Sequence, residues 1–209
     1  MLTKTMQKID ALFATPIYSD DSYKINDDEL NFVKNVEYIK NHHNLVSKQG
    51  YILNHPKLKN LKNYCESKLL QFFIEIYAPT DPIQIFITSS WSNKTKKGER
   101  HHSHDHPNSI LSGVFYVDVG TTDCIEFIKT QQSQMIEWNT RNTYWNSVRW
   151  KLPVKNNLLI MFKSSLSHEV PEVLDDKERL SIAFNSFIKG SIGDNYRKDK
   201  LYIDFKSDI

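Results

Sequence analysis

The hydrophobic pattern of the chain changes near residue 82, and this change limits the folds open to it. Residues 26–41 begin with good N-cap side chains and residues 55–78 carry a long apolar stripe, so both segments are predicted to be helices. After residue 82 the pattern becomes about eight short β-rich runs separated by polar turns. Helices followed by strands predict an α+β domain, with helices covering one face of a sandwich or jelly roll.

Composition excludes several classes of protein. Lys and Arg number 27 and Asp and Glu 25, a net charge of +2 that gives no reason to expect nucleic acid as a partner. The cysteines, Cys65 and Cys124, are too few and too far apart for a disulfide framework, so we expect a reducing, cytoplasmic setting. No run of 18 apolar residues and no signal-peptide pattern is found, so we expect no membrane partner.

The strongest chemical signal is "HHSHDHPNSILSGVFYV" at residues 101–117, which holds four of the eight histidines within six positions. His104 and His106 are two residues apart, so on a strand both rings lie on one face, about 7 Å apart along the backbone. His168 is the only other histidine in the β-rich half. A pair on one strand with a distant third ligand is the facial arrangement of non-haem iron oxygenases. Surface or structural roles for the histidines stay open, and they are expected for His42, His43, His55, His101 and His102.

The stretch "RLSIAFNSF" after His168 alternates in character. Leu180, Ile182 and Phe184 share one face, and the other face carries Arg179, Ser181, Ala183 and Asn185. On that second face an arginine could pair bidentately with a carboxylate held near a metal. Tyr116 is an even number of residues from His104 and His106, so on a continuous strand it shares their face. It either donates a hydrogen bond into the same cavity or packs as a core tyrosine.

These residues resemble a known family. The set H-x-H-P…SGVFYV, a single late histidine and R-x-S is similar to the 2-oxoglutarate/Fe(II)-dependent dioxygenases. The chain looks most like the small 2OG-Fe(II) oxygenases of marine bacteria and cyanophages, distant relatives of prolyl hydroxylases. "ALFATPIY", "SSWSN" and "SIAFN" add to the resemblance, which covers residues 11–188. It implies a double-stranded β-helix (jelly roll) with N-terminal helices packed on one sheet.

The resemblance also implies the roles of individual residues. His104, His106 and His168 fall on the metal-ligand positions. Arg179 falls where the distal carboxylate of 2-oxoglutarate is bound, and Ser181 falls on the position whose hydroxyl assists that arginine. Tyr116 falls on a cosubstrate-binding tyrosine, and Asn185 lines the same strand as Arg179. One departure stands out, because the usual second ligand is a carboxylate and here it is His106. A site of three neutral imidazoles keeps its full +2 charge and makes zinc a competitor.

The resemblance implies Fe(II), 2-oxoglutarate and O2 as cofactor and cosubstrates, with decarboxylation to succinate coupled to oxidation of a primary substrate. Hydroxylation of a protein side chain or a small molecule is the expected outcome, in the host cytoplasm if a phage encodes the chain. The sequence does not identify the substrate, and a homodimer stays open.

Three other functions stay open. A cupin-like metalloprotein is suggested by "G-x5-H-x-H" from Gly98, but Ile110 and Leu111 stand where its glutamate is expected. A non-catalytic phage structural or binding protein would retain the metal site without turnover. A hydrolytic zinc enzyme would need a general base, and none is obvious near the histidines.

We divide the chain into three parts of one structural domain. Residues 1–81 form an N-terminal strand and helices that support the barrel, 82–190 the double-stranded β-helix with the metal site, and 191–209 a C-terminal tail. Residues 11–20 are expected to be an edge strand. Residues 139–150, with Tyr144, Trp145 and Trp150, are predicted to be a long loop over one mouth of the sandwich that either recognises substrate or packs on the rim.

Overall fold

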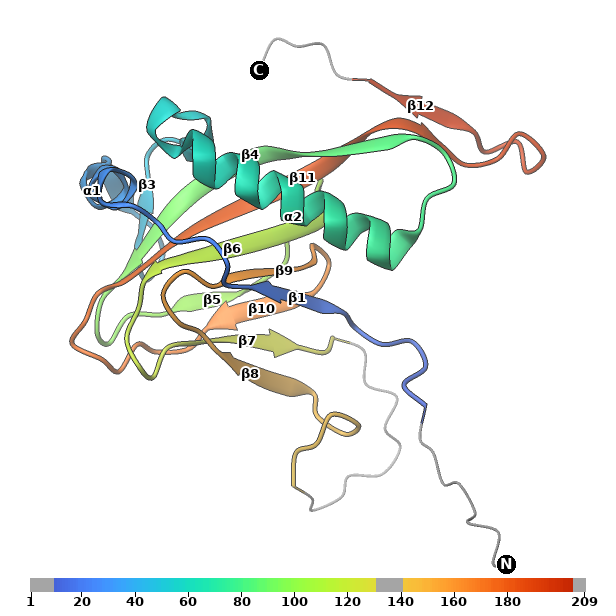
Figure 1. Cartoon of the computed structure of the whole chain (residues 1–209). Coiled ribbons are helices and arrows are strands. Elements are labelled where there is room, and N and C mark those ends of the chain that lie inside the picture. The colour runs from blue at the N-terminus through green and yellow to red at the C-terminus, as the bar shows by residue number, and fades with distance from the viewer. Residues whose placement is uncertain (1–9, 131–140, 205–209) are drawn as a thin grey trace, which may run out of the picture.

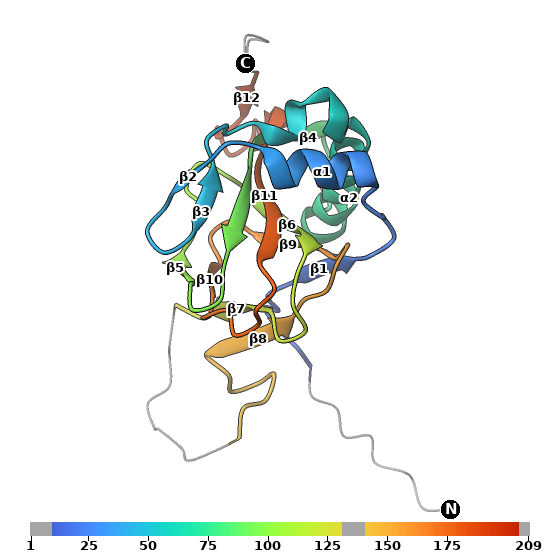
Figure 2. The same ribbon diagram turned by 90° about the vertical axis from the view of Figure 1, so that its left-hand side faces the viewer.

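The computed structural model, which describes residues 10–130 and 141–204, stacks three layers (Figure 1). Two helices, α1 (Asp27–Asn35) and α2 (Lys59–Tyr77), lie over a large sheet, and a small sheet lies on its other side. Figure 2 shows the small sheet from a second direction, again beneath the large one. The strand order of the large sheet is β1-β9-β6-β11-β4-β3-β2, with β12 on β11, and that of the small sheet is β5-β10-β7-β8.

The large sheet is centred on one long strand, β11, which pairs antiparallel with β4, β6 and β12. Their bounds are β1 Ile17–Asp20, β2 Tyr38–Lys40, β3 Leu45–Ser47, β4 Ile83–Thr95, β6 Leu111–Asp118, β9 Leu159–Lys163, β11 Arg179–Ile192 and β12 Leu201–Ile203. Those of the small sheet are β5 His101–His104, β7 Cys124–Ile128, β8 Arg149–Pro153 and β10 Ser167–Val170. Two short 3-10 helices, Ile52–Asn54 and Pro56–Leu58, precede α2.

The helices begin and end where the sequence gives local reasons. The Asn26 side chain accepts a hydrogen bond from the Glu29 N–H, and the Glu29 carboxylate accepts one from the Asn26 N–H, which completes a capping box at α1. α2 ends at Ala78, which adopts the left-handed conformation and donates its N–H to the Ile74 carbonyl. The helix predicted over 26–41 is too long, since residues 38–40 form β2 and pair with β3.

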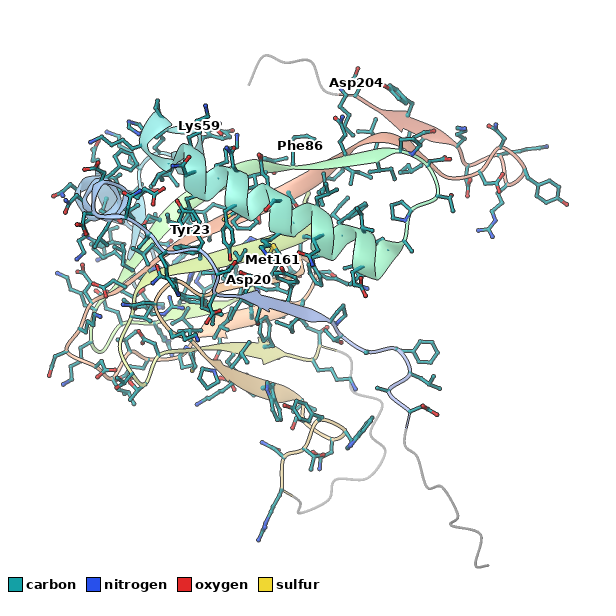
Figure 3. The ribbon with its side chains drawn as sticks, viewed as in Figure 1. Asp20, Tyr23, Lys59, Phe86, Met161 and Asp204 are labelled. Carbon is teal, nitrogen blue, oxygen red and sulfur yellow. The ribbon has the colours of Figure 1, made fainter. Side chains whose placement is uncertain are left out.

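One core lies between the helices and the large sheet. Alternate residues of β6, β9 and β11 enter it, among them Phe115, Met161 and Phe184, and they meet Leu61 and Leu69 of α2. Met161, labelled in Figure 3, lies beneath α2 in this core. The predicted apolar face of β11 is thus confirmed.

A second core lies between the two sheets. Tyr116, Ile160 and Phe162 of the large sheet pack with Ile125 and Phe127 of the small one. Because strand side chains alternate, the polar face of β11 also points into this interior. The polar residues considered for the site therefore lie inside the sandwich rather than on its surface.

Several local expectations are refined by the structure. The strand expected over 11–20 is confined to β1. Of the loop predicted over 139–150, positions 139 and 140 lie outside the described residues, 141–148 have no regular structure, and Arg149 and Trp150 belong to β8 instead. Among the described residues, none of the helices combines the length and apolar character needed to span a bilayer.

Candidate metal centre

His104, His106 and His168 come together at one edge of the small sheet. His104 and His168 are direct partners across β5 and β10, and each of the three residues offers a nitrogen within 4.8 Å of the other two. His106 lies two residues beyond the end of β5, so strand parity does not position it. Its backbone N–H donates to the Ser164 carbonyl at 2.9 Å, which holds the turn against the strand end.

Backbone carbonyls fix two of the imidazole rings. His104 Nδ1 lies 2.8 Å from the His102 carbonyl oxygen, and His168 Nδ1 lies 3.0 Å from that of Leu166. A carbonyl can only accept, so Nδ1 carries the hydrogen in both rings and Nε2 keeps its lone pair. This is the outer support that metal-binding histidines commonly have.

Burial keeps the histidines in the form that binds metals. It lowers the pKa of His106 to about 4 and that of His168 to about 3, with nearby imidazoles acting in the same direction. Phe162 lies against His168 with ring centroids 4.6 Å apart. Neutral imidazole is the ligand form, and imidazoles suit iron, zinc, nickel and copper. The donor set therefore fits a divalent transition-metal ion.

Arg179 is a buried cation without an anion. It is 2% exposed, its Nε has no hydrogen-bond partner, and it forms no ion pair within the described parts of the chain. Its guanidinium carbon lies 5.2 Å from the ring centroid of Tyr116. The Tyr116 hydroxyl is fully buried and also unpartnered, and burial raises its pKa to about 12, so it stays a neutral donor. An unpaired buried charge is costly, so this pocket suits an anionic ligand.

The neighbouring strands add further unpartnered polar atoms. Thr95 of β4 pairs with Arg179 across the sheet, and Ser181 pairs with Asn93 on one side and Tyr116 on the other. Thr95 Oγ1 and Asn93 Oδ1 are buried without hydrogen-bond partners in the described structure. The sequence analysis did not identify either residue. Both share a face of β4 with Trp91, because the three positions are two residues apart, and this spacing could have placed them in the interior.

Asn185 lies farther along the same face of β11. Its Oδ1 accepts a hydrogen bond from Ser112 Oγ at 2.9 Å, and Ser112 is bonded in turn to Ser164 Oγ at 2.8 Å. Ser164 is the residue whose carbonyl holds the His106 backbone. The structure therefore brings Arg179, Ser181 and Tyr116 together and ties Asn185 to the metal end of the interior.

His101 is not exposed, contrary to the expectation from the sequence. It lies in β5 rather than in a loop, is half-buried, and stacks on His104 with ring centroids 4.5 Å apart. Burial, then His104, His102 and Arg179, lowers its pKa to about 3. Phe162 links the cationic pocket and the histidine cluster, since it packs with Tyr116 in the core between the sheets and its ring centroid lies 4.6 Å from that of His168.

The sequence of this region matches a known family. Residues 89–185 match the family described as "Putative 2OG-Fe(II) oxygenase", a segment that holds the three histidines and Arg179. This match supports a 2OG-Fe(II) oxygenase. As an oxygenase of this kind the chain couples 2-oxoglutarate decarboxylation to substrate oxidation and uses Fe(II), 2-oxoglutarate and O2. Neither the cupin-like nor the structural alternative has support from these comparisons.

Solved structures of other oxygenases share the fold. An oxidoreductase of the 2OG-Fe(II) oxygenase family from Burkholderia pseudomallei is 15% identical, with a TM-score of 0.56 over 81% of this chain and 83% of that one. HygX from Streptomyces hygroscopicus, with nickel and 2-oxoglutarate bound, is 9% identical, with a TM-score of 0.57 over 82% of each chain. A Pseudomonas putida prolyl-4-hydroxylase is 11% identical, with a TM-score of 0.53 over 83% of this oxygenase and 94% of that enzyme. No curated protein matches the sequence at a significant level.

Proposed function

We propose that His104, His106 and His168 bind the Fe(II) of this oxygenase and that Arg179 binds the distal carboxylate of 2-oxoglutarate. The observation that carries the proposal is the buried, unpaired guanidinium in the same interior as three convergent imidazoles. A dianionic keto acid supplies the missing negative charge at Arg179 and metal-chelating oxygens at its other end. Few other small ligands satisfy both requirements.

The protein side chains would then bind the metal ion and orient 2-oxoglutarate. Bound Fe(II) supplies the centre at which O2 is activated and 2-oxoglutarate is oxidised. Arg179 and Ser181 would hold the far carboxylate, and the Tyr116 hydroxyl, kept neutral by burial, would donate a hydrogen bond to it. The carbonyls of His102 and Leu166 keep two metal-binding rings in one orientation, and Phe127 and Phe162 exclude water behind His168.

We place Asn185 with the cosubstrate-binding residues at the metal end, where Ser112 fixes its amide. Ser112 and Ser164 link this amide to the backbone of His106, so its N–H2 group can donate a hydrogen bond to an oxygen of the bound keto acid. Thr95 joins the other end of the pocket, because its buried Oγ1 is directly across from Arg179.

We propose that the oxygenase is a hydroxylase of a protein side chain or a small molecule. The likeness to a prolyl-4-hydroxylase supports the first class, and the likeness to HygX, which has been solved with hygromycin B bound, supports the second. The two facing sheets, with the N-terminal helices on the large one, support a double-stranded β-helix, and we propose that the chain belongs with the small oxygenases of marine bacteria and cyanophages. Two unpaired cysteines support a cytoplasmic setting, in the host if a phage encodes the chain.

An anaerobic titration of the apo-protein with Fe(II) and then 2-oxoglutarate tests this proposal. A visible charge-transfer band should form with the wild-type protein, weaken in Arg179→Met and be absent in His168→Gln. Arg149→Met is the matched control, since Arg149 pairs with Glu126 and Glu169 and its side chain is 46% exposed. Iron binding without a band in the wild type would overturn the cosubstrate assignment.

A further inference from the structure

A second group of histidines adjoins the proposed iron ligands. His101, His102 and His104 each offer a nitrogen within 4.8 Å of the other two. Their ring centroids are 4.5 Å apart for His101 and His104, 5.1 Å for His101 and His102, and 5.3 Å for His102 and His104. This spacing is as close as that of the inner triad, whose centroids lie 4.5 to 5.1 Å apart.

The two groups form a path from the surface to the interior. His102 is exposed, His101 and His104 are half-buried, and His168 is 5% exposed. At the outer end, the ring of His42 lies 5.1 Å from that of His102. A surface groove lies beside these residues, lined by the β2–β3 and β4–β5 loops. A hydrated ion that reaches this edge meets imidazoles before it meets the buried site.

His104 belongs to both groups, but it has one lone pair to offer. Its Nδ1 donates to the His102 carbonyl, which leaves only Nε2 as a ligand atom. One nitrogen cannot serve two ions at once by an ordinary coordinate bond. The two histidine groups are therefore alternatives for one ion, not two sites to be filled together.

We propose that His101, His102 and His104 form an outer site for a divalent first-row transition-metal ion, and that this ion passes to the inner triad while His104 stays bound. The inner destination rests on the proposed function. In the transfer, His101 and His102 leave the ion as His106 and His168 replace them, so three imidazoles are available at the start and at the end. No change of charge or oxidation state is involved.

The first experiment removes the inner site and asks whether the outer one binds. Co(II) is added to the full-length His168→Gln variant, and bound metal is counted by equilibrium dialysis together with the Co(II) visible spectrum. We expect one ion in His168→Gln and at least about tenfold weaker binding when His102→Ala is added, the scale of loss seen when a metal site loses even a supporting partner. No binding in His168→Gln, or equal binding in both variants, would refute the outer site.

The second experiment follows metal uptake with the inner site intact. Stopped-flow mixing with Co(II) should show His102→Ala loading at least about tenfold more slowly, while wild type and variant both end with one bound ion. His55→Asn is the control, because it removes an imidazole on the helical side and keeps an acceptor for the Lys57 N–H. Unchanged loading in His102→Ala, or two ions in the wild type, would overturn the transfer path. The 2-oxoglutarate band is unaffected by these outcomes, so failure here is distinguishable from failure of the proposed function.

Discussion

Replacement of Arg179 by methionine should have opposite effects on the empty protein and on cosubstrate binding. The guanidinium is 2% exposed and has no anionic partner in the described structure, so folding buries a charge at a cost of several kcal/mol. Stacking against Tyr116 returns about 2 kcal/mol. A methionine of similar volume removes both the cost of burying the charge and the stacking energy. The apo-protein should therefore become more stable by roughly 1–4 kcal/mol, the range found when buried ion pairs are replaced by apolar residues of similar volume.

Binding should change in the other direction. Loss of one partner of a buried charge pair costs about 2–5 kcal/mol, which is a roughly 30-fold or greater rise in Kd for 2-oxoglutarate. At a concentration 100 times the wild-type Kd, bound cosubstrate stabilises the wild type by about 2.7 kcal/mol. The same concentration should stabilise Arg179→Met by less than about 0.9 kcal/mol.

Thermal unfolding measures both effects in one assay. Apo and Ni(II)-loaded samples are heated with and without 2-oxoglutarate, with nickel preventing turnover, and each kcal/mol moves Tm by about 2–4 °C in a chain of this size. Arg149→Met should leave the 2-oxoglutarate shift unchanged and alter apo stability by no more than about 1 kcal/mol. An Arg179→Met apo-protein that melts below the wild type, or one that keeps the full 2-oxoglutarate shift, would refute the reasoning.

Three further predictions follow from other parts of the structure. His106→Ala should weaken Fe(II) binding at least about tenfold, whereas His106→Asp should restore it, because two histidines and a carboxylate also bind iron; competition against a chromophoric chelator measures both. The folded pKa of His168 is about 3, below the ordinary value of about 6.5, so the unfolded chain takes up a proton first as the pH falls. Apo stability from this residue is thus complete above pH 6.5 and decreases toward pH 3, and urea unfolding of His168→Gln at pH 7.5 and 5 should show a shallower dependence than the wild type. Gly113→Ala would place a Cβ 2.2 Å from the Phe184 ring, so it should lower the free energy of unfolding by about 1–3 kcal/mol; an unchanged urea midpoint would contradict this.

The sequence predicted the parts of the site that depend on strand alternation. A period of two fixes which side chains share a face whatever the neighbouring strands are, so Arg179 and Ser181 were separated correctly from Leu180 and Ile182. The structure pairs His168 with His104 across β10 and β5, which brings the distant third histidine to the other two.

Features that depend on strand neighbours were beyond the sequence pattern. Residues 38–40 have helical spacing, yet pairing with β3 makes them a strand. His101 is half-buried because Val170 of β10 lies opposite it. Thr95 lies beside the buried cation only because β4 aligns it with Arg179. In each case tertiary pairing, not local propensity, decides the outcome.

The division of the site between two sheets has a consequence for how such an enzyme can change. His104 and His168 are carried by the small sheet, while Arg179, Ser181 and Tyr116 are carried by the large one. Phe127 and Phe162 pack between them and act as a spacer. A substitution at this spacer could change the distance between the three histidines and Arg179, and so the length of keto acid that the proposed site accepts, without changing any of those four residues. During evolution the polar residues of each sheet can then change separately, while Phe127 and Phe162 keep the two sheets aligned.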